Sequence, residues 1–195
     1  TNTLGTSNFV AGVNAGNSIT SGGNYNTVVG DEAGTAITTG DENTATGYNS
    51  QLSTTTGNYN TSNGSGSLAT NTTGSNNTAV GRDALVANTT ASNNTAVGYA
   101  SLAANITGGA NVATGYYALN SNTTGTNNTA NGYLALRYNT TASNNTAIGR
   151  SALTANTTAS NNTAVGTSAL TANTTGHSNV ALGVEALDAN TTATY

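Results

Sequence analysis

The chain of 195 residues has a net charge of −4, with seven carboxylates, three arginines and no lysine. Three cationic side chains cannot neutralise a phosphate backbone, which excludes nucleic acid as a partner. The chain has no cysteine for disulfides or thiolate chemistry, and no apolar run reaches the roughly 18 residues of a membrane-spanning helix.

After a leader at residues 1–7, a single repeat domain occupies residues 8–195. Its consensus is N-T-A-V-G-x-x-A-L-x-A-N-T-T-G-S-N, with eleven copies spaced by 17 residues. The first copy ends at Gly12 and is followed by one extra residue near Tyr25. A glycine with access to unusual backbone angles closes each later strand segment and is interpreted as a corner of the coil. These corner glycines are Gly30, Gly47, Gly64, Gly81, Gly98, Gly115, Gly132, Gly149, Gly166 and Gly183.

The Thr-Ala-Val segment of each copy is rich in β-branched residues and predicts a short strand. A 17-residue unit cannot bury an apolar face alone and must stack on its neighbours. The sequence therefore predicts an all-β parallel β-solenoid of about eleven 17-residue coils. We expect the alanine of each strand to lie outward and the next residue to point inward, which applies to Val29, Val80, Val97, Ile148, Val165 and Leu182. Polar residues at that place then predict a wetter or differently packed core around Thr46, Asn63, Thr114 and Asn131.

The second half of the repeat, A-L-x-A, allows two interpretations. Period-2 alternation favours a second strand with leucine inward, whereas the same four residues also fit one helical turn. The leucines are Leu68, Leu85, Leu102, Leu119, Leu136, Leu153, Leu170 and Leu187. In the early copies this place holds Gly16, Gly34 and Gln51.

The closing N-T-T-G-S-N is typical of a turn, and asparagine at one place in every coil suggests a ladder of side-chain amides. The same asparagines begin N-x-T sequons and are candidate glycosylation sites: Asn71, Asn88, Asn105, Asn122, Asn139, Asn156, Asn173 and Asn190. A second set begins N-N-T: Asn76, Asn93, Asn127, Asn144 and Asn161. Glycans would solubilise a weakly charged fibre, but asparagine and threonine also serve turns and ladders without any modification.

Laid out as NNTAVGRDAL, NNTAVGYASL and NNTAIGRSAL, the repeat resembles the heads of trimeric autotransporter adhesins and the N-T-A-x-G-x-x-A-L arrays of phage tail-fibre-like and bacterial surface proteins. The resemblance covers residues 8–195. It implies a left-handed parallel β-roll in an elongated, extracellular, trimeric fibre at a cell or virion surface. The 17-residue unit is longer than that of the adhesins, so the corner geometry must differ.

Few residues suggest chemistry. His177 is the one imidazole and lies in a turn, so a surface substitution is favoured over a general base. Asp31, Glu32, Asp41 and Glu42 are interpreted as solvated acidic turns, with Ca²⁺ binding as the alternative. We therefore expect no enzyme activity, cofactor or metal.

Three functions remain open. A structural fibre that assembles with copies of itself, as a trimer or an end-to-end filament, is favoured. A shaft that binds surface glycans is the alternative, supported by outward tyrosines at Tyr48, Tyr99, Tyr116 and Tyr133. Ice binding is a minor alternative, because the turn threonines are adjacent rather than alternating.

Overall fold

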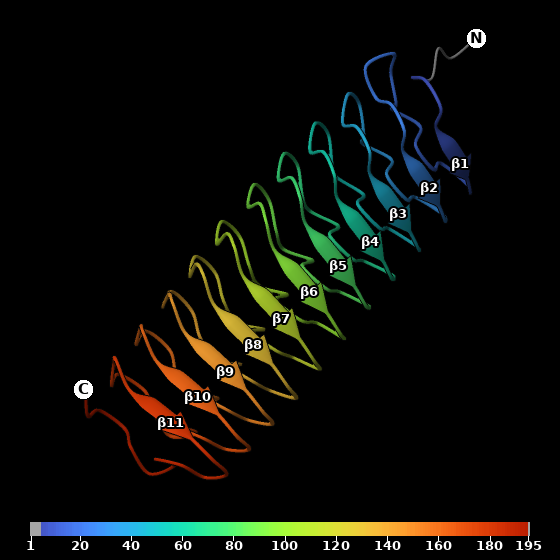
Figure 1. Cartoon of the computed structure of the whole chain (residues 1–195). Helices are drawn as coiled ribbons and strands as arrows, with labels where there is room; N and C mark the ends of the chain where they lie inside the picture. The colour runs from blue at the N-terminus through green and yellow to red at the C-terminus, as the bar shows by residue number, and fades with distance from the viewer. Residues whose placement is uncertain (1–4, 195) are drawn as a thin grey trace.

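Eleven three-residue strands stack in chain order into one parallel sheet (Figure 1). The computed structural model describes residues 5–194. The strands are β1 (Phe9–Ala11), β2 (Thr27–Val29), β3 (Thr44–Thr46), β4 (Thr61–Asn63), β5 (Thr78–Val80), β6 (Thr95–Val97), β7 (Val112–Thr114), β8 (Thr129–Asn131), β9 (Thr146–Ile148), β10 (Thr163–Val165) and β11 (Val180–Leu182). The predicted all-β parallel solenoid is confirmed. Below, each coil takes the number of its strand and runs to the residue before the next strand.

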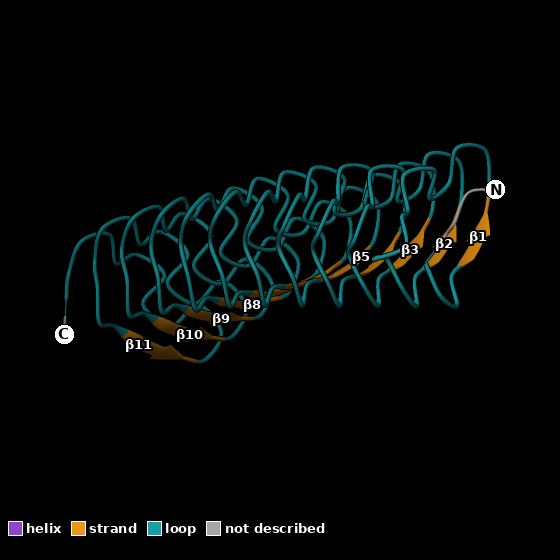
Figure 2. Cartoon of the chain, turned by 90° about the horizontal axis from the view of Figure 1, so that it is seen from above, coloured by secondary structure: helices purple, strands orange, loops and turns teal. Residues whose placement is uncertain are grey.

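The register between coils is uniform. Thr78 pairs with Thr95, and the same offset of 17 residues joins every neighbouring pair from β2 to β11. Phe9 pairs with Thr27, an offset of 18 that accommodates the extra residue of the first copy. Figure 2 shows the strands on one side of the stack and the loops closing each coil on the others.

The strand side chains point opposite to the expected directions. The middle alanine is the buried residue, as at Ala79 with 0% exposure, whereas Val80 is 36%, Ile148 40% and Leu182 78% exposed. Side chains alternate across a strand, so both residues that flank the alanine face outward. The expectation that Val29, Val97 and Val165 also fill the interior is wrong. The polar residues at Thr46, Asn63, Thr114 and Asn131 therefore lie on the outer face and do not wet the core.

The leucine segment is neither a strand nor a helical turn, so both interpretations are wrong. Leu85 lies in the left-handed backbone region with φ 52°, and the other leucines of this column have φ between 50° and 53°. This conformation is uncommon for a branched residue and costs about 1–2 kcal/mol. Full burial of the leucine side chain contributes about 1.5–3 kcal/mol and offsets that cost. Gly16, Gly34 and Gln51 have the same backbone angle, which explains why glycine fits there.

Two apolar clusters fill the interior. The larger extends from Leu68 to Ala181 and consists of the leucines with the alanines that surround them. The smaller occupies coils 1 to 3, where Ile37 and Val28 fill the space left by Gly34. Buried polar side chains around Gln51 separate the two clusters, including Ser50, Ser62 and Ser67. The core volume is thus conserved by paired substitutions in the early coils.

The first residues continue the stack. Residues 1–4 of the expected leader lie outside the described residues, whereas the N–H of Thr6 donates to Oδ1 of Asn24 and its carbonyl accepts from the N–H of Tyr25. In the part of the chain that the structure describes, no helix is long and apolar enough to cross a bilayer.

Candidate interaction surface

Two columns of asparagine run through the interior and link every coil from coil 4 onward. In the first column, each Nδ2 donates to Oδ1 of the asparagine one coil earlier, over 2.8 to 3.2 Å. In the second, each backbone N–H donates to the preceding Oδ1, as from Asn94 to Asn77 at 3.0 Å. The amides satisfy buried turn carbonyls that would otherwise lack partners.

The first column is the set of candidate glycosylation sites. Asn71, Asn88, Asn105, Asn122, Asn139, Asn156 and Asn173 are fully buried, and Asn190 is half-buried in coil 11. A glycan on Nδ2 requires an exposed side chain, so burial speaks against modification at the first seven sites. The second set of sequons, at Asn76, Asn93, Asn127, Asn144 and Asn161, is exposed.

The corner glycines stack on one another. At Gly98, with φ 129°, a Cβ atom would lie 2.6 Å from the carbonyl oxygen of Gly115 in the next coil. The equivalent distances range from 2.2 to 2.8 Å between Gly30 and Gly166. No real Cβ contact is that short, so the column requires glycine for close packing as well as for its backbone angle.

The acidic residues of coil 2 serve the neighbouring coil. Oδ1 of Asp31 accepts from the N–H of Val13 at 3.2 Å, and Oε1 of Glu32 accepts from Nδ2 of Asn14 at 2.7 Å. Asp41 accepts from the N–H of Asn24 at 2.7 Å. Among residues 5–194, no three His, Cys, Asp or Glu side chains gather into a metal site. His177 is exposed, with its ring Nδ1 3.3 Å from the hydroxyl of Ser178.

The tyrosines that follow the corner glycines form a stacked row. The rings of Tyr99, Tyr116 and Tyr133 lie 5.4 Å apart with interplanar angles of 16° and 8°. Tyr117 meets Tyr99 and Tyr116 edge-on. The ring faces therefore cover one another and present their edges to solvent. Tyr48 occupies the same column in coil 3 and is exposed.

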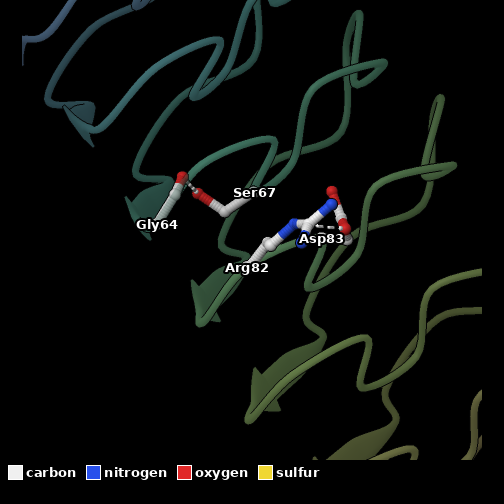
Figure 3. A network of polar contacts seen from close by, with 4 residues as sticks. All are labelled: Gly64, Ser67, Arg82 and Asp83. Carbon is white, nitrogen blue, oxygen red and sulfur yellow. Dashed lines mark hydrogen bonds and ion pairs between the residues drawn. The ribbon is translucent and has the colours of Figure 1, made fainter.

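Three arginines flank this row. The guanidinium of Arg137 lies 5.1 Å from the ring centre of Tyr117 and 4.9 Å from that of Tyr138. Arg82 lies 5.8 Å from Tyr99, and its Nε forms a 3.2 Å ion pair with Asp83 (Figure 3). Figure 3 also shows the preceding coil, where the hydroxyl of Ser67 donates to the carbonyl of Gly64 at 2.8 Å.

The cations are unequally compensated. Arg82–Asp83 is the ion pair formed among residues 5–194, so Arg137 and Arg150 have no carboxylate partner there. The buried Nε of Arg137 also lacks a hydrogen-bond acceptor. The interaction with Tyr99, first by a side-chain hydrogen bond, raises the pKa of Tyr117 above the ordinary 10.0, and desolvation adds to the shift.

Sequence reasoning singled out Tyr99, Tyr116 and Tyr133 but missed their partners. Tyr117, Arg137 and Tyr138 fall two, five and six places after a corner glycine, and their contacts depend on how the turn folds. Arg82 and Arg150 share the column of the three tyrosines, so their place could have been found by counting 17 residues.

Comparison of the chain with known protein families, with characterised proteins and with solved structures found no match.

Proposed function

We propose that the chain is a structural segment of an extracellular fibre at a cell or virion surface, built by coil stacking and by assembly with copies of itself. The support is the uniform register, which makes each coil a template for the next. A rod of eleven coils at about 4.8 Å each is about 50 Å long. Its stability is a sum of repeated coil-to-coil contacts, which suits a mechanical role.

The face of coil 11 carries the proposal. Leu187 is 52% exposed, whereas Leu170 at the same place one coil earlier is fully buried. A further coil of the same repeat, from a continuing chain or from another copy, would cover Leu187. It would also pair with the free edge of β11. Unpaired strand edges of this kind template the addition of further strands.

Electron microscopy of the purified chain tests this function. We expect rods that are multiples of the single-chain length, and Leu187→Asp should shorten them to single units because it buries a charge at the junction. Thr175→Asp, with the same charge at an exposed side position, is the control and should assemble as the unsubstituted chain does. Single units alone in the unsubstituted protein would refute end-to-end assembly.

Glycan binding is a second candidate, favoured by the tyrosine row. Because the rings of Tyr99, Tyr116 and Tyr133 are stacked, their hydroxyls and edges, rather than their faces, are free to contact a sugar. Hydrogen bonding would then dominate over ring stacking. A glycan array, with Tyr116→Phe as the variant that removes a hydroxyl and keeps the stack, tests this function.

Ice binding gains one new observation. Thr78 and Val80 both face outward and are two residues apart, so the outer face of the sheet carries two columns of mostly β-branched side chains. In the turn, by contrast, the first threonine of the pair is occupied, as when the hydroxyl of Thr72 donates to the carbonyl of Thr89. Thermal hysteresis that Thr95→Lys on the sheet abolishes, and Thr90→Lys in the turn does not, would establish this function.

A further inference from the structure

One side of the rod differs from the repeat everywhere else. We name it the tyrosine–arginine face; it consists of Arg82, Tyr99, Tyr116, Tyr117, Tyr133, Arg137, Tyr138 and Arg150, from coils 5 to 9. These residues include all three arginines of the chain. Tyrosine and arginine, without lysine, are the residue types enriched in the centres of protein–protein interfaces. The composition of the face therefore favours a protein partner.

The same side carries complementary charge in coil 2. Asp31 and Glu32 are the two residues after a corner glycine, the places that Arg82 and Asp83 occupy in coil 5. Along the rod this side is acidic at coil 2, neutral at the Arg82–Asp83 pair of coil 5, and basic at coils 8 and 9 through Arg137 and Arg150. An acidic partner for the basic coils is thus present on the chain itself.

We infer that two copies pack side by side and antiparallel through this side, with coil 2 of each rod against coils 8 and 9 of the other. This inference deepens the proposed fibre function, because it gives fibre-forming rods a lateral contact. A parallel pair in register would place every charge against its own like. The antiparallel pair is two-fold symmetric, so each favourable contact occurs twice.

The remaining coils agree with this arrangement. Coil numbers of facing coils add up to ten or eleven, so coil 5 faces coil 5 or 6 of the second copy. The Arg82–Asp83 pairs then lie near the symmetry axis, where each arginine can approach the carboxylate of the other copy. Tyr48, in coil 3, faces the tyrosines of coils 7 and 8, which covers exposed aromatic surface. The acidic coil 11, with Glu185 and Asp188, extends past the end of the second rod.

Charge reversal with sedimentation velocity tests the pairing, in a Leu187→Asp background so that rods do not elongate. Side-by-side pairing then doubles the mass without lengthening the rod, whereas failure of the fibre proposal shows only as absent elongation in the unsubstituted chain. We expect Glu32→Arg and Arg150→Glu each to weaken the dimer about tenfold or more, because each places like charges opposite one another. Raising the salt concentration should weaken the unsubstituted dimer.

The decisive measurement is a one-to-one mixture of the two variants. In a mixed antiparallel pair both ends regain opposite charges, so we expect its Kd to return close to that of the unsubstituted dimer. Glu185→Arg, in the same column as Glu32 but beyond the overlap, is the matched control and should leave the Kd unchanged. Far-UV circular dichroism checks that each variant keeps the fold. Arg150 is a safe site because its side chain makes no hydrogen bond or ion pair among residues 5–194.

Three results would overturn the inference. The first is a chain that sediments as a monomer at every concentration, and the second is a mixture that dimerises no better than the single variants. The third is a monomer that binds a sulfated polysaccharide, such as heparin, and loses this binding with Arg150→Glu; the face would then serve a polyanion.

Discussion

Asn88 donates a hydrogen bond from Nδ2 to Oδ1 of Asn71 at 2.9 Å, and Asn105 repeats the bond to Asn88 at 3.0 Å. These side chains are fully buried, so each is both the partner of its neighbour and the reason that the neighbour tolerates burial. We expect Asn88→Ala to lower the free energy of unfolding by about 2–4 kcal/mol, because Oδ1 of Asn71 loses its donor and a cavity forms. Urea unfolding measures the change. Thr90→Ala, one turn away and exposed, should change stability by less than about 0.5 kcal/mol.

The glycine column gives a sharper contrast. Gly98→Ala should prevent coils 6 and 7 from packing, because its Cβ would lie 2.6 Å from the carbonyl oxygen of Gly115. We expect a loss of several kcal/mol or insoluble protein. Gly109→Ser should instead be neutral or stabilising. Elsewhere a serine at this place accepts from the N–H one coil earlier, as Ser92 does from Ser75, and Gly109 offers Ser92 no such acceptor. Equal melting temperatures for the two variants would contradict this account.

Gln51 replaces a core leucine and should be a weak point. Its Nε2 donates to Thr44, Asn60 and Ser62, but its buried Oε1 has no partner. We expect Gln51→Leu to raise stability by about 1–2 kcal/mol, because it removes the unpaired acceptor and joins the two apolar clusters. The reverse change, Leu85→Gln, should destabilise, since alanines surround that site. Thermal unfolding of both variants checks the prediction, and a less stable Gln51→Leu would disprove it.

Alkaline pH should weaken the tyrosine row. The raised pKa of Tyr117 means that the folded protein holds this proton more tightly than the unfolded chain does. The resulting stabilisation is complete below the ordinary value of 10.0 and is lost as pH rises through the folded pKa. Melting temperatures measured from pH 8 to 11 should fall, and should fall less in Tyr117→Phe. Tyr48→Phe, in the same stacked column but without a ring neighbour, is the control; an identical fall in Tyr117→Phe would exclude Tyr117 as the cause.

Glycosylation can be tested by expressing the chain in a host that modifies sequons. We expect glycans on the exposed column of Asn76, Asn93, Asn127, Asn144 and Asn161, and none on the buried column that contains Asn88. Peptide mass spectrometry assigns each site. Full occupancy of Asn88 in a folded, soluble product would mean that the asparagine ladder does not form.

The repeat length and the corner glycines were sufficient to predict the solenoid, because only a stack gives a 17-residue unit enough buried surface. They did not predict which strand face lies inside. Alanine is small and valine is a typical core residue, so Val80 seemed the better interior residue; yet the space beside Leu85 admits only a methyl group at Ala79. The leucine segment was missed for a related reason. No propensity favours left-handed leucine, and only the packing of the closed coil makes that conformation worthwhile. The tyrosine row was visible as a column, but its arginine partners depend on turn geometry.

The narrow cross-section of the stack has a mechanical consequence. Each coil of 17 residues occupies only about 4.8 Å along the axis, yet the same residues span roughly 56–61 Å when fully extended. A coil peeled away under tension therefore releases about 50 Å of contour length, close to the length of the whole folded rod. Strands bonded side by side across the pulling direction would yield one after another, so such a rod could dissipate a sudden load through a few sacrificed coils while the rest keep their grip.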